Sequence, residues 1–289
     1  MKPPAFEYAR PETLDEAIAL IAEHGEDAKL LAGGQSLMPM LNLRLAEPRL
    51  LIDVNRVPGL AGIRRDNGSI RIGAMTRHRE LESPGEAALA EPLIARAARE
   101  IGHLAIRSRG TIGGSIAHAD PAAEWPLLAV TLGAQIELRS ASALRIVAAR
   151  DFFVGPFTTS ARPDEILTAV IFPVAPPGSG FGFHELCRRL GDFAIVAVAC
   201  RVRIDAGKCT GGTLAIGGAD AVPRYVSEID SLIRGSRGED PILRDVGEVA
   251  ARAVDPTSDL HGSAGYRRKV VAVLTRRALH DAFAQARAA

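Results

Sequence analysis

The sequence predicts an α+β protein made of several compact units. Three features support this class: a βαβ-like pattern near the N-terminus, a hairpin signal after it, and antiparallel strands followed by helices near the C-terminus. The 289 residues are too many for one small core and sufficient for two or three units. We expect three units, over residues 1–57, 58–175 and 176–289.

The first unit is predicted to alternate helices with buried strands. An amphipathic helix over residues 13–23, with Thr13 as its N-cap, precedes a buried strand over 28–32. A second helix is expected from Leu37, and a second buried strand over 50–54. Together these elements form a βαβ-like unit.

The second unit begins with a predicted β-hairpin. Two extended runs, 61–65 and 69–72, flank the dipeptide Asn67-Gly68, which is a strong turn signal between strands. Further helices are expected over residues 92–102 and 121–132, and further strands over 134–139 and 165–172.

A linker is predicted over residues 173–180, where prolines and glycines are concentrated. The pattern beyond it indicates antiparallel strands over 194–204 and 213–217, with a turn at Ala206-Gly207 between them. The rest of the chain is expected to be mostly helical, ending in a basic helix over 266–288.

Composition and charge argue against several classes of function. The formal net charge is +1, so no broad electrostatic surface points to nucleic acid or an anionic membrane. No apolar run approaches the roughly 20 residues needed to cross a bilayer. The first residues lack the apolar core of a signal peptide. We therefore expect a cytoplasmic protein without a transmembrane segment.

The cysteines do not predict a metal centre. Cys187, Cys200 and Cys209 form no CxxC pair and cannot supply the four thiolates that an iron–sulfur cluster usually needs. Their alternative role is that of small buried apolar residues. If this chain carries electrons, an organic cofactor must hold them.

Two glycine-rich segments are candidates for binding an anion. In the first, Gly33-Gly34 lies between a strand and a helix, and Ser36 offers a hydroxyl. The second is predicted to be a loop over residues 109–121, in which Gly113-Gly114 is followed by Ser115. We expect the paired glycines of both segments to expose backbone N–H groups to an anion. Two such segments could hold a diphosphate from both sides, although each also has a purely structural reading as a tight turn. Neither matches a Walker P-loop or the GxGxxG of a Rossmann fold.

Three segments resemble the flavoprotein subunits of the molybdenum hydroxylases. This is the type found as the medium chain of carbon monoxide dehydrogenase and the FAD-binding subunit of xanthine dehydrogenase. The segments are LAGGQSL (31–37), which continues through NLRLA (42–46) to IDV (52–54); IRSRGTIGGSIA (106–117), followed by DPA (120–122); and RRLGDFA (188–194). Their order and spacing agree with that family from near Phe6 to about residue 285.

The resemblance implies a fold and a cofactor. The fold is a FAD-binding domain of the vanillyl-alcohol-oxidase (p-cresol methylhydroxylase) type in two α+β subdomains, followed by a small C-terminal domain with an antiparallel sheet and helices. In that family the first segment holds the FAD diphosphate, which implies contacts from Ala32, Gly33, Gly34, Gln35, Ser36 and Leu37. The second also reaches the diphosphate and approaches the flavin, which implies contacts from Thr111, Ile112, Gly113, Gly114 and Ser115.

Further cofactor contacts are implied more weakly. Glu124 stands where relatives usually carry Asp, and it is expected near the ribityl or adenosine portion. Asp120 lies in the same segment. Ile166 matches an apolar residue that lies near the isoalloxazine ring in the family.

Two departures from the family and one acidic residue add three candidates. His118 replaces an Asn found in many relatives, and His184 stands near a position where some have Lys. A lone histidine also has an ordinary structural reading, although one that titrates near a flavin would tune its potential. Asp192 has a local capping or ion-pair reading beside its reading as a ligand contact.

The function implied is that of an FAD-dependent oxidoreductase subunit that relays electrons. A molybdenum-cofactor large subunit would oxidise the substrate and a 2Fe–2S small subunit would carry electrons to this chain, in a dimer of heterotrimers. Such a chain needs no catalytic acid or base of its own. Two alternatives remain at this stage: a self-contained flavin oxidase or dehydrogenase, and a nucleotide-binding module without redox chemistry.

Overall fold

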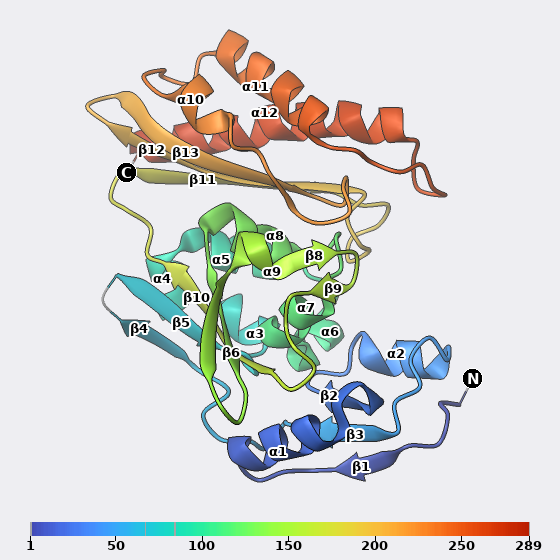
Figure 1. Cartoon of the computed structure of the whole chain (residues 1–289). Helices are drawn as coiled ribbons and strands as arrows, with labels where there is room; N and C mark the ends of the chain where they lie inside the picture. The colour runs from blue at the N-terminus through green and yellow to red at the C-terminus, as the bar shows by residue number, and fades with distance from the viewer. Residues whose placement is uncertain (1, 67, 84, 289) are drawn as a thin grey trace.

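The α+β class is confirmed by a computed structural model, which describes residues 2–66, 68–83 and 85–288. Figure 1 shows three tiers: the N-terminal elements at the bottom, a five-stranded sheet with its helices in the middle, and a four-stranded sheet with the C-terminal helices at the top. Three hydrophobic clusters of buried residues underlie these tiers.

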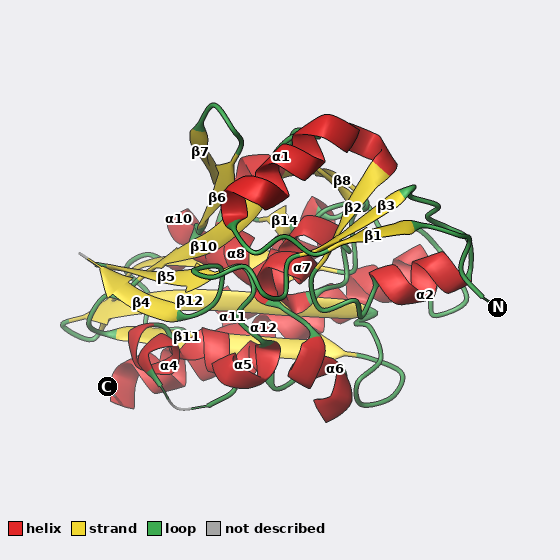
Figure 2. Cartoon of the chain, turned by 90° about the horizontal axis from the view of Figure 1, so that it is seen from below, coloured by secondary structure: helices red, strands yellow, loops and turns green. Residues whose placement is uncertain are grey.

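The bottom tier is a parallel three-stranded sheet covered by one helix. The strand order is β1 (Glu7–Ala9), β3 (Leu50–Asp53) and β2 (Ala28–Leu31). Helix α1 (Leu14–His24) lies along this sheet in both views (Figure 1, Figure 2). The βαβ-like prediction is therefore confirmed. Strand β1 was missed because its three residues are exposed or half-buried and carry no apolar pattern.

Local signals place α1 as the sequence predicts. The Thr13 hydroxyl accepts a hydrogen bond of 3.2 Å from the Glu16 backbone N–H, which caps the helix. Ala17, Ile18 and Ile21 form its buried face. The helix α2 (Leu37–Asn42) also begins where expected, with Pro39 in its first turn.

The middle tier contains an antiparallel five-stranded sheet. The predicted hairpin strands are present and pair from Ile63↔Ile72 to Asp66↔Ser69, whereas Asn67 of the predicted turn lies outside the described residues. The order is β4 (Ile63–Asp66), β5 (Ser69–Gly73), β10 (Ile166–Pro173), β6 (Gln135–Arg139) and β7 (Leu144–Ala148). A separate two-stranded ribbon is formed by β8 (Phe153–Gly155) and β9 (Thr158–Thr159).

Helices fill the space between this sheet and the top tier. They are α3 (His78–Leu81), α4 (Glu86–Ala90), α5 (Pro92–Ala98), α6 (Leu104–Arg109), α7 (Ile112–His118), α8 (Glu124–Leu132) and α9 (Ala149–Phe152). Every residue of α8 is buried, and Trp125 is fully enclosed. Because α8 is buried on all sides, it lies at the centre of the fold.

The second glycine-rich segment was expected as a loop, and that expectation is wrong. Gly113 and Gly114 lie in the first turn of α7, whose N-cap is Thr111. Small residues hid this helix from the apolar pattern, since glycine and alanine give almost no periodic signal. The predicted helix over 121–132 correspondingly begins later, at Glu124.

The top tier is an antiparallel sheet in the order β11 (Ser179–Leu186), β12 (Val196–Asp205), β13 (Lys208–Gly217) and β14 (Arg224–Tyr225). The predicted turn at Ala206-Gly207 joins β12 to β13, with φ values of 47° and 75°. Helices α10 (Ile229–Ile233), α11 (Asp240–Ala253) and α12 (Ala264–Ala288) lie above the sheet (Figure 1).

Strand β11 was not predicted, and it takes up part of the expected linker. Its glycines let it approach α12 closely: a Cβ on Gly182 would overlap the carbonyl oxygen of Ala278. Its side chains Phe181 and Phe183 point the other way and join the core of the middle tier. The top tier is thereby packed directly on the middle one.

No helix within the described residues is both long enough and apolar enough to cross a membrane.

Candidate functional site

The first glycine segment forms a tight turn between β2 and α2. Gly34 has a φ of 72°, in the left-handed region that glycine adopts without strain. At Gly33, an added Cβ would overlap the carbonyl oxygen of Arg109 and lie 2.7 Å from the Cα of Gly110. The two glycine segments, far apart in sequence, are thus in direct contact.

This turn carries main-chain donors without partners. The backbone N–H groups of residues 33–36 donate to no acceptor anywhere in residues 2–66, 68–83 and 85–288. Such a run of free amides around a left-handed glycine is a concave anion site. A cavity of about 320 Å³ adjoins it, and seven residues line this cavity: Leu31, Gly33, Gly34, Gln35, Met38, Pro39 and Arg109. A phosphate group fits these donors and the Arg109 charge.

The second glycine segment is built differently. The N–H groups of Ile112 and Gly113 donate to the carbonyl oxygens of Thr76 (3.1 Å) and Ala74 (2.8 Å). Those of Gly114 and Ser115 donate to Thr111, at its Oγ1 and O atoms, both at 3.1 Å. The expectation that both segments offer free amides is therefore wrong for residues 112–115.

Close packing explains the glycines of α7. A Cβ on Gly113 would lie 2.5 Å from the Cβ of Ala74. A Cβ on Gly114 would lie 2.8 Å from Thr111 Oγ1, with Ala32 Cβ next at 3.6 Å. Since larger residues would push α7 outward, the glycines bring this helix against the first segment.

Glu124, which is buried, and Glu185, which is half-buried, place two acidic side chains near each other between the middle and top tiers. Burial raises the pKa of Glu124 to about 7, and the nearby carboxyls of Asp120 and Glu100 add to the rise. Burial raises the pKa of Glu185 to about 8, with Glu124 and Glu100 adding to it. One Glu185 oxygen is buried without a hydrogen-bond partner among the described residues. Both carboxyls therefore hold protons at neutral pH more readily than free glutamates do.

Glu185 was missed by sequence reasoning, which chose its neighbour His184. Side chains alternate along β11, so Phe183 and Glu185 face the middle tier and His184 faces α12. There His184 Nε2 lies 2.8 Å from Asp281 Oδ2. The structure does not bring His184 together with the glycine segments.

His118 lies at the end of α7 and is half-buried. Its ring centroid is 5.1 Å from that of Phe157, whose backbone N–H donates to Ala119 O at 3.0 Å. Burial lowers the pKa of His118, and the charge of Asp120 acts against this. Asp120 itself shapes the turn into α8 by accepting a hydrogen bond of 2.9 Å from the Ala122 N–H.

Asp192 lies exposed in the loop that follows β11. Its backbone N–H donates to Arg189 O at 3.0 Å. The preceding Gly191 has a φ of 86° and lies against the ring of His103, where a Cβ would overlap. This loop therefore rests on the start of α6, next to the second glycine segment.

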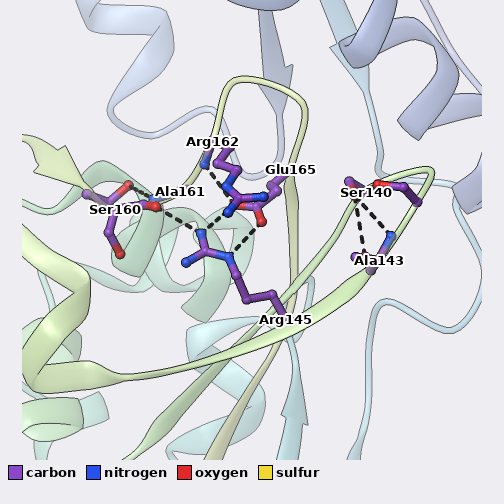
Figure 3. Close-up of polar contacts among 9 residues, drawn as sticks. Ser140, Ala143, Arg145, Ser160, Ala161, Arg162 and Glu165 are labelled. Atoms are coloured by element: carbon purple, nitrogen blue, oxygen red, sulfur yellow. Dashed lines mark hydrogen bonds and ion pairs between the residues drawn. The ribbon is translucent and has the colours of Figure 1, made fainter.

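Ile166 is buried in the core that joins β10 to the bottom tier, rather than lining the cavity. Its neighbour Glu165 fixes the start of β10 (Figure 3): Arg145 donates to both its carboxylate oxygens, at 2.8 and 2.6 Å, and the Arg162 N–H donates at 2.8 Å. Burial alone would raise the pKa of Glu165, but these bonds outweigh it and hold that pKa below its usual value.

A turn with free amides against a glycine-bearing helix, in an α+β chain of three tiers, defines a protein that binds a phosphate-containing cofactor. Two family models match the chain: "FAD binding domain in molybdopterin dehydrogenase" over residues 4–175 and "CO dehydrogenase flavoprotein C-terminal domain" over residues 181–282. The chain belongs to the family of FAD-binding subunits of molybdenum hydroxylases, and the resemblance found in its sequence is confirmed.

Individual relatives match over nearly the whole chain. The 6-hydroxypseudooxynicotine dehydrogenase complex subunit alpha of Paenarthrobacter nicotinovorans is 39% identical, covering 99% of this chain and 97% of the relative. The carbon monoxide dehydrogenase medium chain of Afipia carboxidovorans is 37% identical, covering 99% and 100%.

Solved structures agree with this assignment. A chain of carbon monoxide dehydrogenase from Hydrogenophaga pseudoflava superposes with a TM-score of 0.96 at 35% identity, covering 99% of each chain. A chain of quinoline 2-oxidoreductase from Pseudomonas putida 86 gives 0.95 at 34% identity, again covering 99% of each. The predicted fold and the predicted cofactor, FAD, are both confirmed.

Proposed function

We propose that this chain is the FAD-binding electron-transfer subunit of a molybdenum hydroxylase complex. FAD, when bound, supplies a centre that accepts electrons singly and releases them singly or in pairs. The chain's own residues bind the cofactor, orient it and set the charge around it. The observation that carries the proposal is the turn over residues 33–36: its backbone N–H groups have no acceptor among the described residues, and Gly33, Gly34 and Gln35 line a cavity together with Arg109.

The site residues divide by the work proposed for them. The first segment holds the diphosphate with its amides and the Ser36 hydroxyl: Ala32, Gly33, Gly34, Gln35, Ser36 and Leu37. The second forms the opposite wall, since its own amides are largely used within the protein: Thr111, Ile112, Gly113, Gly114 and Ser115.

Four more residues stay in the proposed site. Glu124 is proposed to donate a hydrogen bond to a hydroxyl of the cofactor, since its raised pKa keeps it partly protonated at neutral pH. His118, Asp120 and Asp192 complete the surroundings. His184 is not retained, because it faces α12, and Ile166 is retained only as support for the site.

Partners and location are part of the same proposal. The matched relatives are named as medium chains or as subunits of dehydrogenase complexes. We propose a molybdenum-cofactor large subunit and a 2Fe–2S small subunit as partners, in a dimer of heterotrimers located in the cytoplasm. The units 1–57, 58–175 and 176–289 would then serve as two cofactor-binding subdomains and a C-terminal domain.

Absorption spectroscopy of the purified chain tests the electron-transfer role. We expect a flavin spectrum that bleaches with dithionite and not with a panel of aldehydes, purines and N-heterocycles. Bleaching by one such compound without any partner would instead support a self-contained flavin oxidase. A chain that cannot be reconstituted with FAD would contradict the proposal. Affinity purification from the native organism should recover the two partner subunits.

A further inference from the structure

Two side chains outside both glycine segments tie these segments together. Asn55 follows β3 in the bottom tier, and Arg77 precedes α3 in the middle tier. Both are half-buried, and neither belongs to the three family-like segments of the sequence. Arg77 Nη2 donates to Asn55 Oδ1 at 2.6 Å. This bond connects the two tiers beside the cavity.

Asn55 holds the first segment. Its Nδ2 donates to Ala32 O at 2.8 Å and lies 3.3 Å from Leu31 O, directly before the free amides. Asp53 orients this side chain by accepting bonds from the Asn55 backbone N–H at 2.9 Å and from Nδ2 at 2.6 Å. The amide orientation is consistent throughout, since Nδ2 meets only acceptors and Oδ1 meets only a donor.

Arg77 holds the second segment through both its backbone and its side chain. Its backbone pairs with Thr111 in an antiparallel bridge, and its Nη1 donates to Arg109 O. That carbonyl is the group on which Gly33 packs. A continuous chain of hydrogen bonds, here called the relay, therefore connects Ala32 O to Arg109 O through the side chains of Asn55 and Arg77.

This chain of hydrogen bonds fixes the distance between the two glycine segments, which packing alone would leave adjustable. At this contact the three atoms nearest to a Cβ built on Gly33 are all backbone atoms of Arg109 and Gly110. Binding a diphosphate between two segments that are already aligned avoids the entropic cost of aligning them. The hydrogen bonds that the charged Arg77 guanidinium donates are stronger than hydrogen bonds between neutral groups.

We infer that Asn55 and Arg77 are positioning residues that hold the two glycine segments at the spacing which binds FAD. The inference rests on the proposed function only in taking FAD as the ligand of the cavity. Neither residue needs to touch the cofactor, and the two act as one unit, because each is needed to complete the same relay.

Titration of the flavin-free full chain with FAD tests this inference. We expect Arg77→Ala and Asn55→Ala each to raise the Kd for FAD at least about tenfold, the effect of losing roughly 1.4 kcal/mol. The double variant should be no weaker than the weaker single variant, since both break one relay. Arg79→Ala is the matched control: it removes an exposed arginine two positions away and should leave the Kd within about twofold.

Two further variants separate positioning from charge and from folding. Arg77→Lys keeps the positive charge, but a single ammonium cannot replace both bonds of the fork, so FAD binding should stay weak. Asn55→Asp still accepts from Arg77 but cannot donate to Ala32 O, and it should also bind weakly. This variant decides the matter if Arg77→Ala fails to fold, as judged by circular dichroism.

Three outcomes would overturn the inference while leaving FAD binding intact. They are wild-type affinity in both alanine variants, wild-type affinity in Arg77→Lys, and fully additive losses in the double variant. Failure of the wild-type chain to bind FAD is a different result, because it would contradict the proposed function itself.

Discussion

The indole Nε1 of Trp125 donates a hydrogen bond of 2.9 Å to Nδ1 of His78, in the core beneath the second glycine segment. Trp125 is fully buried and His78 is 4% exposed. A Cβ on Gly110 would lie 2.6 Å from His78 Nε2, so this pair supports the segment from below. Because Nδ1 accepts a bond, the imidazole is neutral and carries its proton on Nε2.

This pair predicts an acid-sensitive core. Burial, together with the charges of Arg77 and Arg107, lowers the pKa of His78 to about 4. The unfolded chain takes up the proton near pH 6.5, so the stability contributed by His78 is complete above that pH and is lost as the pH falls towards 4. Between pH 7 and pH 5 the loss should be about 2 kcal/mol.

Urea denaturation measures this loss, with the fluorescence of Trp125, the only tryptophan in the chain, as the signal. His78→Gln should show a smaller decrease in the free energy of unfolding between the same two pH values. Parallel pH dependence in the two proteins would contradict the assignment of the neutral imidazole.

Gly33 predicts a specific loss of flavin. Gly33→Ala places a methyl group into the carbonyl of Arg109, so the two glycine segments must separate or the turn must rearrange. We expect FAD retention after gel filtration to fall at least about tenfold, with little change in far-UV circular dichroism. Gly265→Ala, in open space on α12, is the control and should retain FAD normally. Equal retention in both variants would remove the first segment from the diphosphate site.

The acidic pair predicts a pH dependence of opposite sign. The pKa of Glu185 is raised in the folded chain, so the folded state favours its protonated form. Its contribution is complete below about pH 4.5 and is lost as the pH rises through about 8. Glu185→Gln mimics the protonated form and should therefore match the wild type at pH 4.5. At pH 8.5 the variant should be more stable, by about 1 kcal/mol.

Thermal and urea unfolding of the flavin-free chain at both pH values would measure this difference. Using the flavin-free chain keeps any change in cofactor affinity out of the result. A stability gap between Glu185→Gln and the wild type that does not vary with pH would show that Glu185 titrates normally.

A buried ion pair joins the middle and top tiers and predicts a strong coupling between them. Arg201 Nη1 lies 3.1 Å from Glu91 Oε2, and the Glu91 side chain is fully buried. Burial raises the pKa of Glu91 to about 7 although Arg201 lowers it. Arg201→Met leaves this carboxyl without its charged partner and should cost about 3–5 kcal/mol.

The double variant Glu91→Gln with Arg201→Met should recover most of that cost, because no buried charge remains. Denaturant unfolding of the two single variants and the double variant gives the coupling free energy. Simple additivity of the single effects would mean that the two side chains do not interact energetically.

Elements with strong local signals were predictable from the sequence. The Thr13 cap places α1, the runs flanking residues 67–68 place β4 and β5, and Ala206-Gly207 places the turn between β12 and β13. Family membership was also recognisable, because three short segments keep their order and spacing. In each case the informative residues are near neighbours in the chain, so the pattern is complete within a short window.

Elements stabilised by distant partners were not predictable in this way. Strand β1 has no apolar pattern and owes its place to pairing with β3. Strand β11 packs its glycines on α12 and its phenylalanines on the middle tier. Because one face consists of glycines, the sequence resembles a linker and not a strand with alternating apolar and polar residues. The sequence could not favour Glu185 over His184 for the same reason, since only the pairing of β11 decides which face each side chain takes.

The sequence by itself determined that two paired-glycine segments exist and that they belong to an FAD-binding family. Only the tertiary structure decided that the amides of residues 33–36 are free whereas those of 112–115 are satisfied by Thr76, Ala74 and Thr111. The two glycine pairs look alike as letters. They differ because the fold brings acceptor oxygens to the N–H groups of one pair and not to those of the other.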